Sequence, residues 1–133
     1  MPALTIEHGE TSVTQVLERL TGAGAVMCAN DLLALGVLRG LADRKVKVPD
    51  DVSVVGYDDV SFASMLSPAL TSVRQPKFEI GVAGAELLLE ESHNLGHVHR
   101  EVRFEPELIV RASSTPTHWT PLRKIEATRR TTS

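Results

Sequence analysis

Two short apolar runs constrain the fold more than any other feature of this sequence. The first, AVMCA, spans residues 25–29, and the second, VSVVG, spans residues 52–56. Continuous apolar runs of this length are typical of parallel strands that are covered on both faces. The segment between them, from Asp31 to Arg44, has the apolar spacing of an amphipathic helix. A strand, a helix and a second strand in this order predict an α/β fold with a doubly wound parallel sheet.

Periodicity and turn residues predict further elements on both sides of this unit. Before it, we expect a short strand and then an amphipathic helix capped by Thr11 or Ser12. After it, we expect a short helix or loop, another strand, a long helix and a strand pair bent at Pro106. The ranges are 4–7 for the first strand, 61–66 for the short helix or loop, 70–74 for the later strand, 78–92 for the long helix and 102–110 for the strand pair.

The composition excludes several classes of function. The chain has 133 residues, of which 42% are hydrophobic, so one globular domain is expected. A net charge of −3 gives no electrostatic footprint for binding a phosphate backbone. The single cysteine, Cys28, lies inside the first apolar run, which indicates a core residue and excludes a disulfide framework. No apolar run approaches the ~18 residues of a membrane span, so we expect a cytoplasmic protein without membrane contact.

Polar residues follow both apolar runs. Asn30 ends the first run and Asp58 the second. The carboxyl ends of parallel strands face a common crevice in which ligands bind. Amide and carboxylate groups there suit a ligand rich in hydroxyl or amino groups, such as a sugar or a nucleoside, better than a phosphate. For the neighbours Asp31 and Asp59 we expect structural roles, as a helix N-cap and a turn residue. For Asn30 and Asp58 themselves, spacing leaves ligand binding and a structural role equally open.

Four stretches carry a family resemblance. They are AVMCANDLLALGVLRGL, VPDDVSVVGYDD, SPALTSVRQP and PELIVRAS, in this order and at fitting intervals between residues 25 and 116. Together they resemble the effector-sensing domain of LacI/GalR-type transcription repressors, which is similar in fold to periplasmic sugar-binding proteins. The resemblance implies a partial periplasmic-binding-protein-like type I fold, consisting mostly of the C-terminal subdomain.

The resemblance also implies a ligand site. Asn30, Asp58 and Gln75 match positions that commonly hydrogen-bond the effector in the family, and Asp58 is expected to accept from two ligand hydroxyls. Phe62 and Lys77 are candidates for the border of the pocket, and for Phe62 a core role is equally open. Lys77 stands where several relatives have an aromatic side chain against the sugar, which leaves the identity of the ligand open.

A homodimer is a further expectation. The helix from residue 31 to 44 has one apolar stripe for the sheet and a second apolar side that needs another cover. The stripe comprises Ala34, Val37, Leu38 and Leu41, and the second side comprises Leu32, Leu35 and Ala42. Either the loop at residues 62–66 covers the second side, or a second copy of the chain does. The resemblance favours the dimer, with Leu32, Leu35 and Leu66 at its interface.

The resemblance divides the chain into segments. Residues 1–76 match part of the C-terminal subdomain, residues 77–100 match a helix that packs on the N-terminal subdomain in the family, and residues 101–116 match the closing strands. Residues 117–133 are expected to be a disordered tail. Because no helix-turn-helix headpiece is found in the sequence, we expect a fragment that reaches DNA only through a headpiece not present in this chain.

Other patterns carry less weight. His93, His97 and His99 lack the regular spacing of a zinc site, and GAGA at residues 22–25 precedes a strand, where a dinucleotide fingerprint would follow one. No nucleophile, base and orienting residue have a plausible spacing, so we expect no enzyme, no metal and no cofactor.

The alternative to a regulatory sensor is the solute-binding component of a sugar ABC transporter, which shares the fold.

Overall fold

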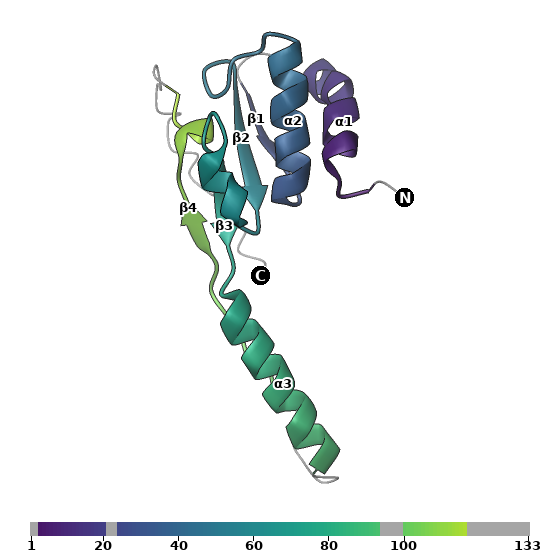
Figure 1. The fold of residues 1–133 in the computed structure, drawn as a ribbon, viewed down its shortest axis with the longest axis vertical. Helices are drawn as coiled ribbons and strands as arrows, with labels where there is room; N and C mark the ends of the chain where they lie inside the picture. The colour runs from purple at the N-terminus through teal and green to yellow at the C-terminus, as the bar shows by residue number, and fades with distance from the viewer. Residues whose placement is uncertain (1–2, 21–23, 94–99, 117–133) are drawn as a thin grey trace, which may run out of the picture.

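A computed structural model of the chain describes residues 3–20, 24–93 and 100–116. Its four strands form one sheet in the order β1-β2-β3-β4, with parallel pairing up to β3 and antiparallel pairing of β4. Helices α1 and α2 lie beside the sheet, and α3 points away from it (Figure 1). The elements are α1 (Ile6–Arg19), β1 (Gly24–Met27), α2 (Asp31–Asp43), β2 (Val52–Tyr57), the 3-10 helix η1 (Ser61–Met65), β3 (Thr71–Arg74), α3 (Lys77–His93), β4 (Glu107–Ile109) and the 3-10 helix η2 (Ala112–Ser114).

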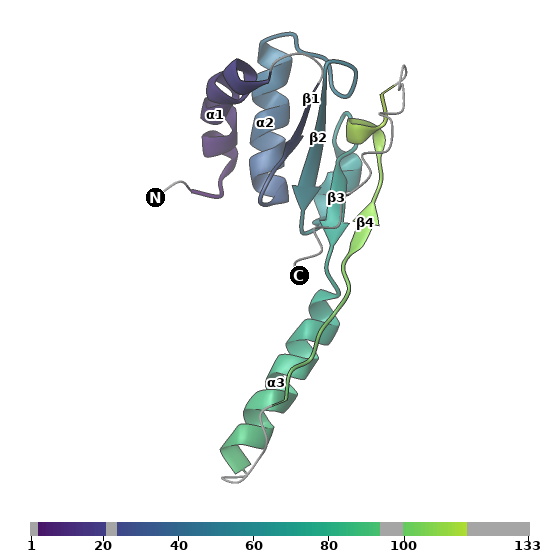
Figure 2. The same cartoon turned by 180° about the vertical axis from the view of Figure 1, so that it is seen from behind.

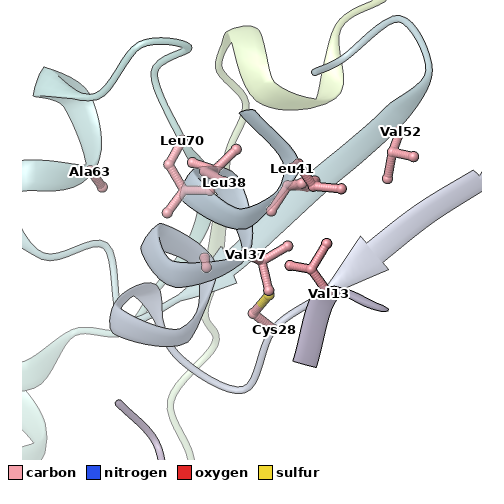
Figure 3. Close-up of a cluster of buried hydrophobic side chains, with 10 residues drawn as sticks. Val13, Cys28, Val37, Leu38, Leu41, Val52, Ala63 and Leu70 are labelled. Carbon is pink, nitrogen blue, oxygen red and sulfur yellow. The ribbon is translucent and has the colours of Figure 1, made fainter. Parts of the chain in front are cut away.

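One hydrophobic core lies between α2 and a single face of the sheet (Figure 3). The stripe predicted to face the sheet is buried, because Ala34, Val37, Leu38 and Leu41 are each at most 8% exposed. Val52 and Val54 of β2 and Leu70, directly before β3, complete this core on the sheet side, and Val13 joins it from α1. The α/β class and the parallel arrangement predicted from the sequence are therefore confirmed.

The expectation that the strands are covered on both faces is wrong for the described residues. Along β2, buried and half-buried positions alternate. Met27 of β1 is 69% exposed and pairs with Val55, and Leu108 of β4 is 56% exposed and pairs with Val73. These residues share the face opposite to the core. An apolar run shows only that both faces of a strand are apolar, and it does not show that both are covered.

The N-terminal segment also differs from the expectation. The short strand predicted before the first helix does not form, because α1 starts earlier and Thr5 caps it by accepting from the His8 N–H at 3.3 Å. Thr11 and Ser12, expected as caps, lie inside the helix, where the Ser12 hydroxyl donates to the His8 carbonyl at 2.6 Å. At the other end, the described residues hold one strand after Pro106, β4, and not a pair.

Close contact between α1 and α2 explains this early start. Gly9 of α1 and Gly36 of α2 meet where the helices cross, and a methyl group on Gly36 would overlap the Ile6 carbonyl. A methyl group on Gly9 would overlap the Leu33 carbonyl. A glycine inside a helix is unfavourable by roughly 0.5–1 kcal/mol relative to alanine. The packing that these glycines allow offsets that loss.

Substitution of Gly36 with alanine is expected to destabilise the chain. The added methyl group cannot enter the helix contact without moving α1, and overpacking of this kind costs about 1–3 kcal/mol of unfolding free energy. Gly84→Ala on α3 is the matched control, because a methyl group there meets no atom within 4 Å. Urea unfolding followed by circular dichroism measures both. Equal stability of the two variants would contradict the contact.

A cluster of ion pairs fastens the segment after β2 to the chain around β4. The Asp59 carboxylate, 6% exposed, lies 2.7 Å from both the Arg74 and the Arg111 guanidinium groups. Arg111 also donates to the Leu70 carbonyl at 2.7 Å. Burial alone would raise the pKa of Asp59, but hydrogen bonds and charges from Arg111 and Arg74 outweigh it and hold the pKa below the usual 3.8. Asp59 has φ 47°, which agrees with the turn residue expected from the sequence. Its carboxylate in addition forms the two ion pairs with Arg74 and Arg111.

Asp59→Asn is expected to lower the unfolding free energy at neutral pH by about 1.5–3 kcal/mol, the range for hydrogen bonds to charged groups. Because the folded-state pKa is depressed, this stabilisation is present above pH 3.8 and is lost as the pH falls below that value and through the folded-state pKa. The stability gap between the two proteins should therefore narrow in acid. Urea titrations across pH measure it, with the exposed Glu101→Gln as control. A gap independent of pH would contradict the ion-pair assignment.

Candidate functional site

Three predicted ligand residues lie at one edge of the sheet. Because β1, β2 and β3 are parallel, their carboxyl ends share this edge. Asp58 directly follows β2, Gln75 directly follows β3, and Asn30 lies three residues after the end of β1. All three side chains are half-buried. The predicted grouping along this edge is thus present in the structure.

Asp58 and Gln75 are in direct contact. The Gln75 Nε2 donates to the Asp58 Oδ1 at 3.1 Å. The backbone of Asp58 has φ 106°, and its N–H donates to the Val73 carbonyl at 2.9 Å. A carboxylate has about four acceptor positions, so this contact leaves Asp58 able to accept from a ligand. The pair forms an acceptor-rich polar site, with an amide that can both donate and accept.

Asn30 has a structural role that the sequence left open. It caps α2, because its Oδ1 accepts from the Leu33 N–H at 2.9 Å and its Nδ2 donates to the Leu4 carbonyl at 3.3 Å. The expectation that Asp31 is the cap is therefore wrong. A part in ligand binding stays a prediction for Asn30, and a ligand would have to share these hydrogen bonds.

Asp31 is a buried residue that sequence reasoning treated as a helix end. Its carboxylate is 1% exposed and accepts from the Ser72 hydroxyl at 2.6 Å and from the Val60 N–H at 2.8 Å. A methyl group on Gly56 would overlap the Asp31 Oδ1, so the glycine makes room for the carboxylate. The signal that could have found Asp31 is helical spacing, since it stands three residues before buried Ala34 in the stripe that faces the sheet.

The two candidate border residues lie on the elements that follow β2 and β3. Phe62 is half-buried in η1. Lys77 opens α3 with an exposed side chain, and its N–H donates to the Gln75 carbonyl at 2.9 Å. Their contact with a ligand stays a prediction for both residues.

Cys28 is a core residue, as the sequence predicted. It is 5% exposed, and burial together with the charge of Asp31 raises the pKa of its thiol to about 11. The thiol therefore stays protonated at neutral pH, whereas nucleophilic chemistry uses the thiolate.

The remaining sequence patterns add no site to the described residues. His93 lies at the end of α3, where its Nδ1 is 2.8 Å from the Leu89 carbonyl, while His97 and His99 lie outside the described residues. The described part of the chain contains no cluster of three metal-ligating side chains. Of the GAGA stretch, residues 22–23 also lie outside it. Among the described helices, none combines the length and apolar character that a membrane crossing requires.

Comparison with known proteins identifies the domain. A family model described as a periplasmic binding protein-like domain matches residues 2–114. The transcriptional repressor PurR of Vibrio parahaemolyticus is 44% identical over 87 residues, which are 65% of this chain and 26% of that protein. A LacI family transcriptional regulator from Enterococcus faecalis, solved with bound ribose, is 35% identical with a TM-score of 0.78, over 88% of this chain and 43% of that chain. The transcriptional regulator CelR, solved with cellobiose, is 38% identical with a TM-score of 0.72, over 83% of this chain and 34% of that chain.

The matched region includes every site residue discussed above. The chain spans 26% of the PurR relative and less than half of the two solved structures. The order of the sheet and the extent of the matches agree with the family resemblance of the sequence. The chain therefore belongs to the periplasmic binding protein-like domain family and, within it, to the sensing domains of LacI/GalR-type transcriptional regulators.

Proposed function

We propose that this chain is the effector-binding and dimer-forming part of a LacI/GalR-type transcriptional regulator, and that its effector is a sugar-like or nucleoside-like molecule. The observation that carries this proposal is the hydrogen-bonded pair of Asp58 and Gln75 at the carboxyl edge of the parallel strands. In this proposal, contact with DNA belongs to a helix-turn-helix headpiece and not to these residues.

The chemistry of the edge supports a polyhydroxyl ligand. Asp58 supplies a charged acceptor, and Gln75 supplies a carbonyl oxygen and an amide that can face the same ligand. Hydrogen bonds to a charged group contribute about 1.5–3 kcal/mol each, so Asp58 is the anchor of the site. The ribose and cellobiose in the two similar solved structures are ligands of this class. Asn30 joins the site in this proposal, with Phe62 and Lys77 at its border.

The course of α3 supports the proposed division of the domain. None of its 17 residues is buried, and Phe78 and Leu88 are 78% and 68% exposed. The chain before β4 returns along α3 (Figure 2), where Arg100 pairs with Glu90 at 3.1 Å. In this proposal, residues 1–76 belong to the C-terminal subdomain, and residues 77–100 carry a helix that packs on an N-terminal subdomain, which supplies the other wall of the cleft. Residues 101–116 supply the closing strands. The proposed tail at residues 117–133 lies outside the described residues.

The named relatives favour a sensor over the solute-binding component of a sugar transporter. PurR is a transcriptional repressor, and CelR is a transcriptional regulator in complex with a sugar. A regulator that binds a small molecule and acts on DNA works in the cytoplasm. It needs no catalytic group, so the proposed protein is not an enzyme. Effector binding would act by changing the closure of the two subdomains.

Loss of the Asp58 carboxylate is expected to weaken effector binding at least ~10-fold, which corresponds to about 1.4 kcal/mol. The test uses a chimera that joins the N-terminal subdomain of the ribose-bound Enterococcus faecalis regulator to this chain. Calorimetry screens it against sugars and nucleosides, including ribose and cellobiose. Asp58→Ala is compared with Asp43→Ala, which removes an exposed carboxylate at the end of α2. A chimera that binds nothing, or binds equally well in both variants, would overturn the site.

The outward side of α2 is the proposed dimer interface. Leu32 is 40% exposed and Leu35 is half-buried, so η1 and the loop after it do not fully cover this side. Leu66 lies next to η1 and packs partly against the core. A two-fold dimer brings each residue of such a patch against the same patch of the second copy.

Leu35→Asp is expected to shift the dimer toward monomer. The change places two carboxylates in one interface, where like charges that lose water cost several kcal/mol of association free energy. Light scattering on the same chimera measures the mass, and circular dichroism checks that it is folded. Gln15→Asp, on the exposed side of α1, is the control and should stay dimeric. A folded Leu35→Asp variant that remains dimeric at micromolar concentration would exclude this helix from the interface.

A further inference from the structure

The turn that carries Asp58 is held in an unusual backbone conformation. Asp58 and Asp59 have positive φ angles of 106° and 47°, which non-glycine residues seldom adopt. Such conformations persist where the surrounding structure fixes them. Three successive N–H groups of this turn have acceptors: Asp58 N–H donates to the Val73 carbonyl at 2.9 Å, Asp59 N–H to the Ser72 hydroxyl at 3.0 Å, and Val60 N–H to the Asp31 carboxylate at 2.8 Å.

Two of these three acceptors belong to one buried pair. The Ser72 hydroxyl receives the Asp59 N–H and donates in turn to the Asp31 Oδ1 at 2.6 Å. Ser72 is fully buried and Asp31 is 1% exposed. Ser72 comes from β3 and Asp31 from α2, so the pair connects the turn after β2 to both neighbouring elements. In a buried site these hydrogen bonds are shielded from competition by water.

Helix capping does not explain this carboxylate. Asn30 already caps α2, and Asp31 turns both of its oxygens toward partners outside its own helix. A buried carboxylate is unfavourable unless hydrogen bonds satisfy it. The Asp31 carboxylate is explained by the turn after β2, because one of its oxygens accepts from the Val60 N–H and the other from the Ser72 hydroxyl that holds the Asp59 N–H.

We propose that Asp31 and Ser72 are positioning residues of the effector site. Through the N–H groups of Asp59 and Val60, they hold the turn in the conformation that sets the Asp58 carboxylate against Gln75. The assignment rests on the proposed function, since it gives the pair its role in effector binding. The Asp58 carboxylate is then already in its binding position before the ligand binds, which lowers the entropy cost of ordering the site on binding.

The consequence can be observed without any ligand. If Asp31 holds the turn, then Asp31→Asn, which replaces one acceptor oxygen by a donor amide, loosens the Asp58 and Gln75 contact. In this chain labelled with nitrogen-15, the side-chain amide resonances of Gln75 should move toward those of a free glutamine. Hydrogen exchange at the Val60 N–H should accelerate at least ~10-fold.

Asp51→Asn is the matched control for this measurement. Asp51 is also an aspartate that accepts a backbone N–H, that of Lys47 at 2.8 Å, but it precedes β2 at the opposite end of the strand. The control should leave Gln75 and Val60 unchanged. A general loss of stability in Asp31→Asn would speed hydrogen exchange throughout the core, whereas a positioning role changes Gln75 and Val60 and leaves the exchange of the core amides unchanged.

Two further measurements test the positioning role if the Asp31→Asn variant does not fold. Ser72→Ala removes a single oxygen and should also move the Gln75 resonances. In the unmodified chain, the Val60 N–H should exchange slowly although Val60 lies outside every strand and helix among the described residues. Rapid exchange there, or unchanged Gln75 resonances in a folded Asp31→Asn variant, would overturn the positioning role. Because no ligand enters, that result would leave the sugar-binding proposal standing.

Discussion

The burial of α2 against one face of the parallel sheet is the contact on which the rest of the structure depends. Val37 enters the core from the middle of α2 and Leu41 from near its end, while Asp31 lies at the start of the same stripe. Helix α2 runs alongside the strands (Figure 1), and Asp31 bonds to Ser72 of β3 and to the Val60 N–H beyond the end of β2. The hydrophobic contact therefore places a carboxylate beside the proposed ligand site.

Three aspartates near this edge have different roles because their surroundings differ. Asp31 is buried and satisfied by hydrogen bonds from a hydroxyl and a backbone N–H. Asp59 is nearly buried and neutralised by two guanidinium groups. Asp58 remains half-buried with an amide partner, Gln75. The polar residues that follow β1 and β2 thus fasten the turn at residues 58–60, and the Asp58 carboxylate keeps acceptor positions that this turn does not use.

Much of this arrangement could be predicted from the sequence, and the failures have physical causes. Parallel topology brings strand ends together, so Asn30 and Asp58 were expected at one edge, and the family resemblance added Gln75, which contacts Asp58 there. The cap of α2 was assigned one residue too late, because asparagine and aspartate are equally good caps and spacing does not separate them. The start of α1 was missed because residues 4–7 were interpreted as a strand and Thr11 or Ser12 as the cap. The contact between Gly9 and Gly36 is a property of two packed helices, which no local pattern shows.

The sequence by itself determined the local preferences: which runs are apolar, where helices repeat, and which polar residues follow a strand. These depend on neighbours along the chain, and they were sufficient for the α/β class, the stripe of α2 and the candidates Asn30 and Asp58, while the family resemblance added Gln75. Tertiary structure alone decided which face of the sheet is covered and which carboxylate is paired with arginine. It also decided that Asp31 serves the turn at Val60, 29 residues away. Burial and hydrogen bonding between distant segments depend on how the elements pack, and no local pattern encodes that distance.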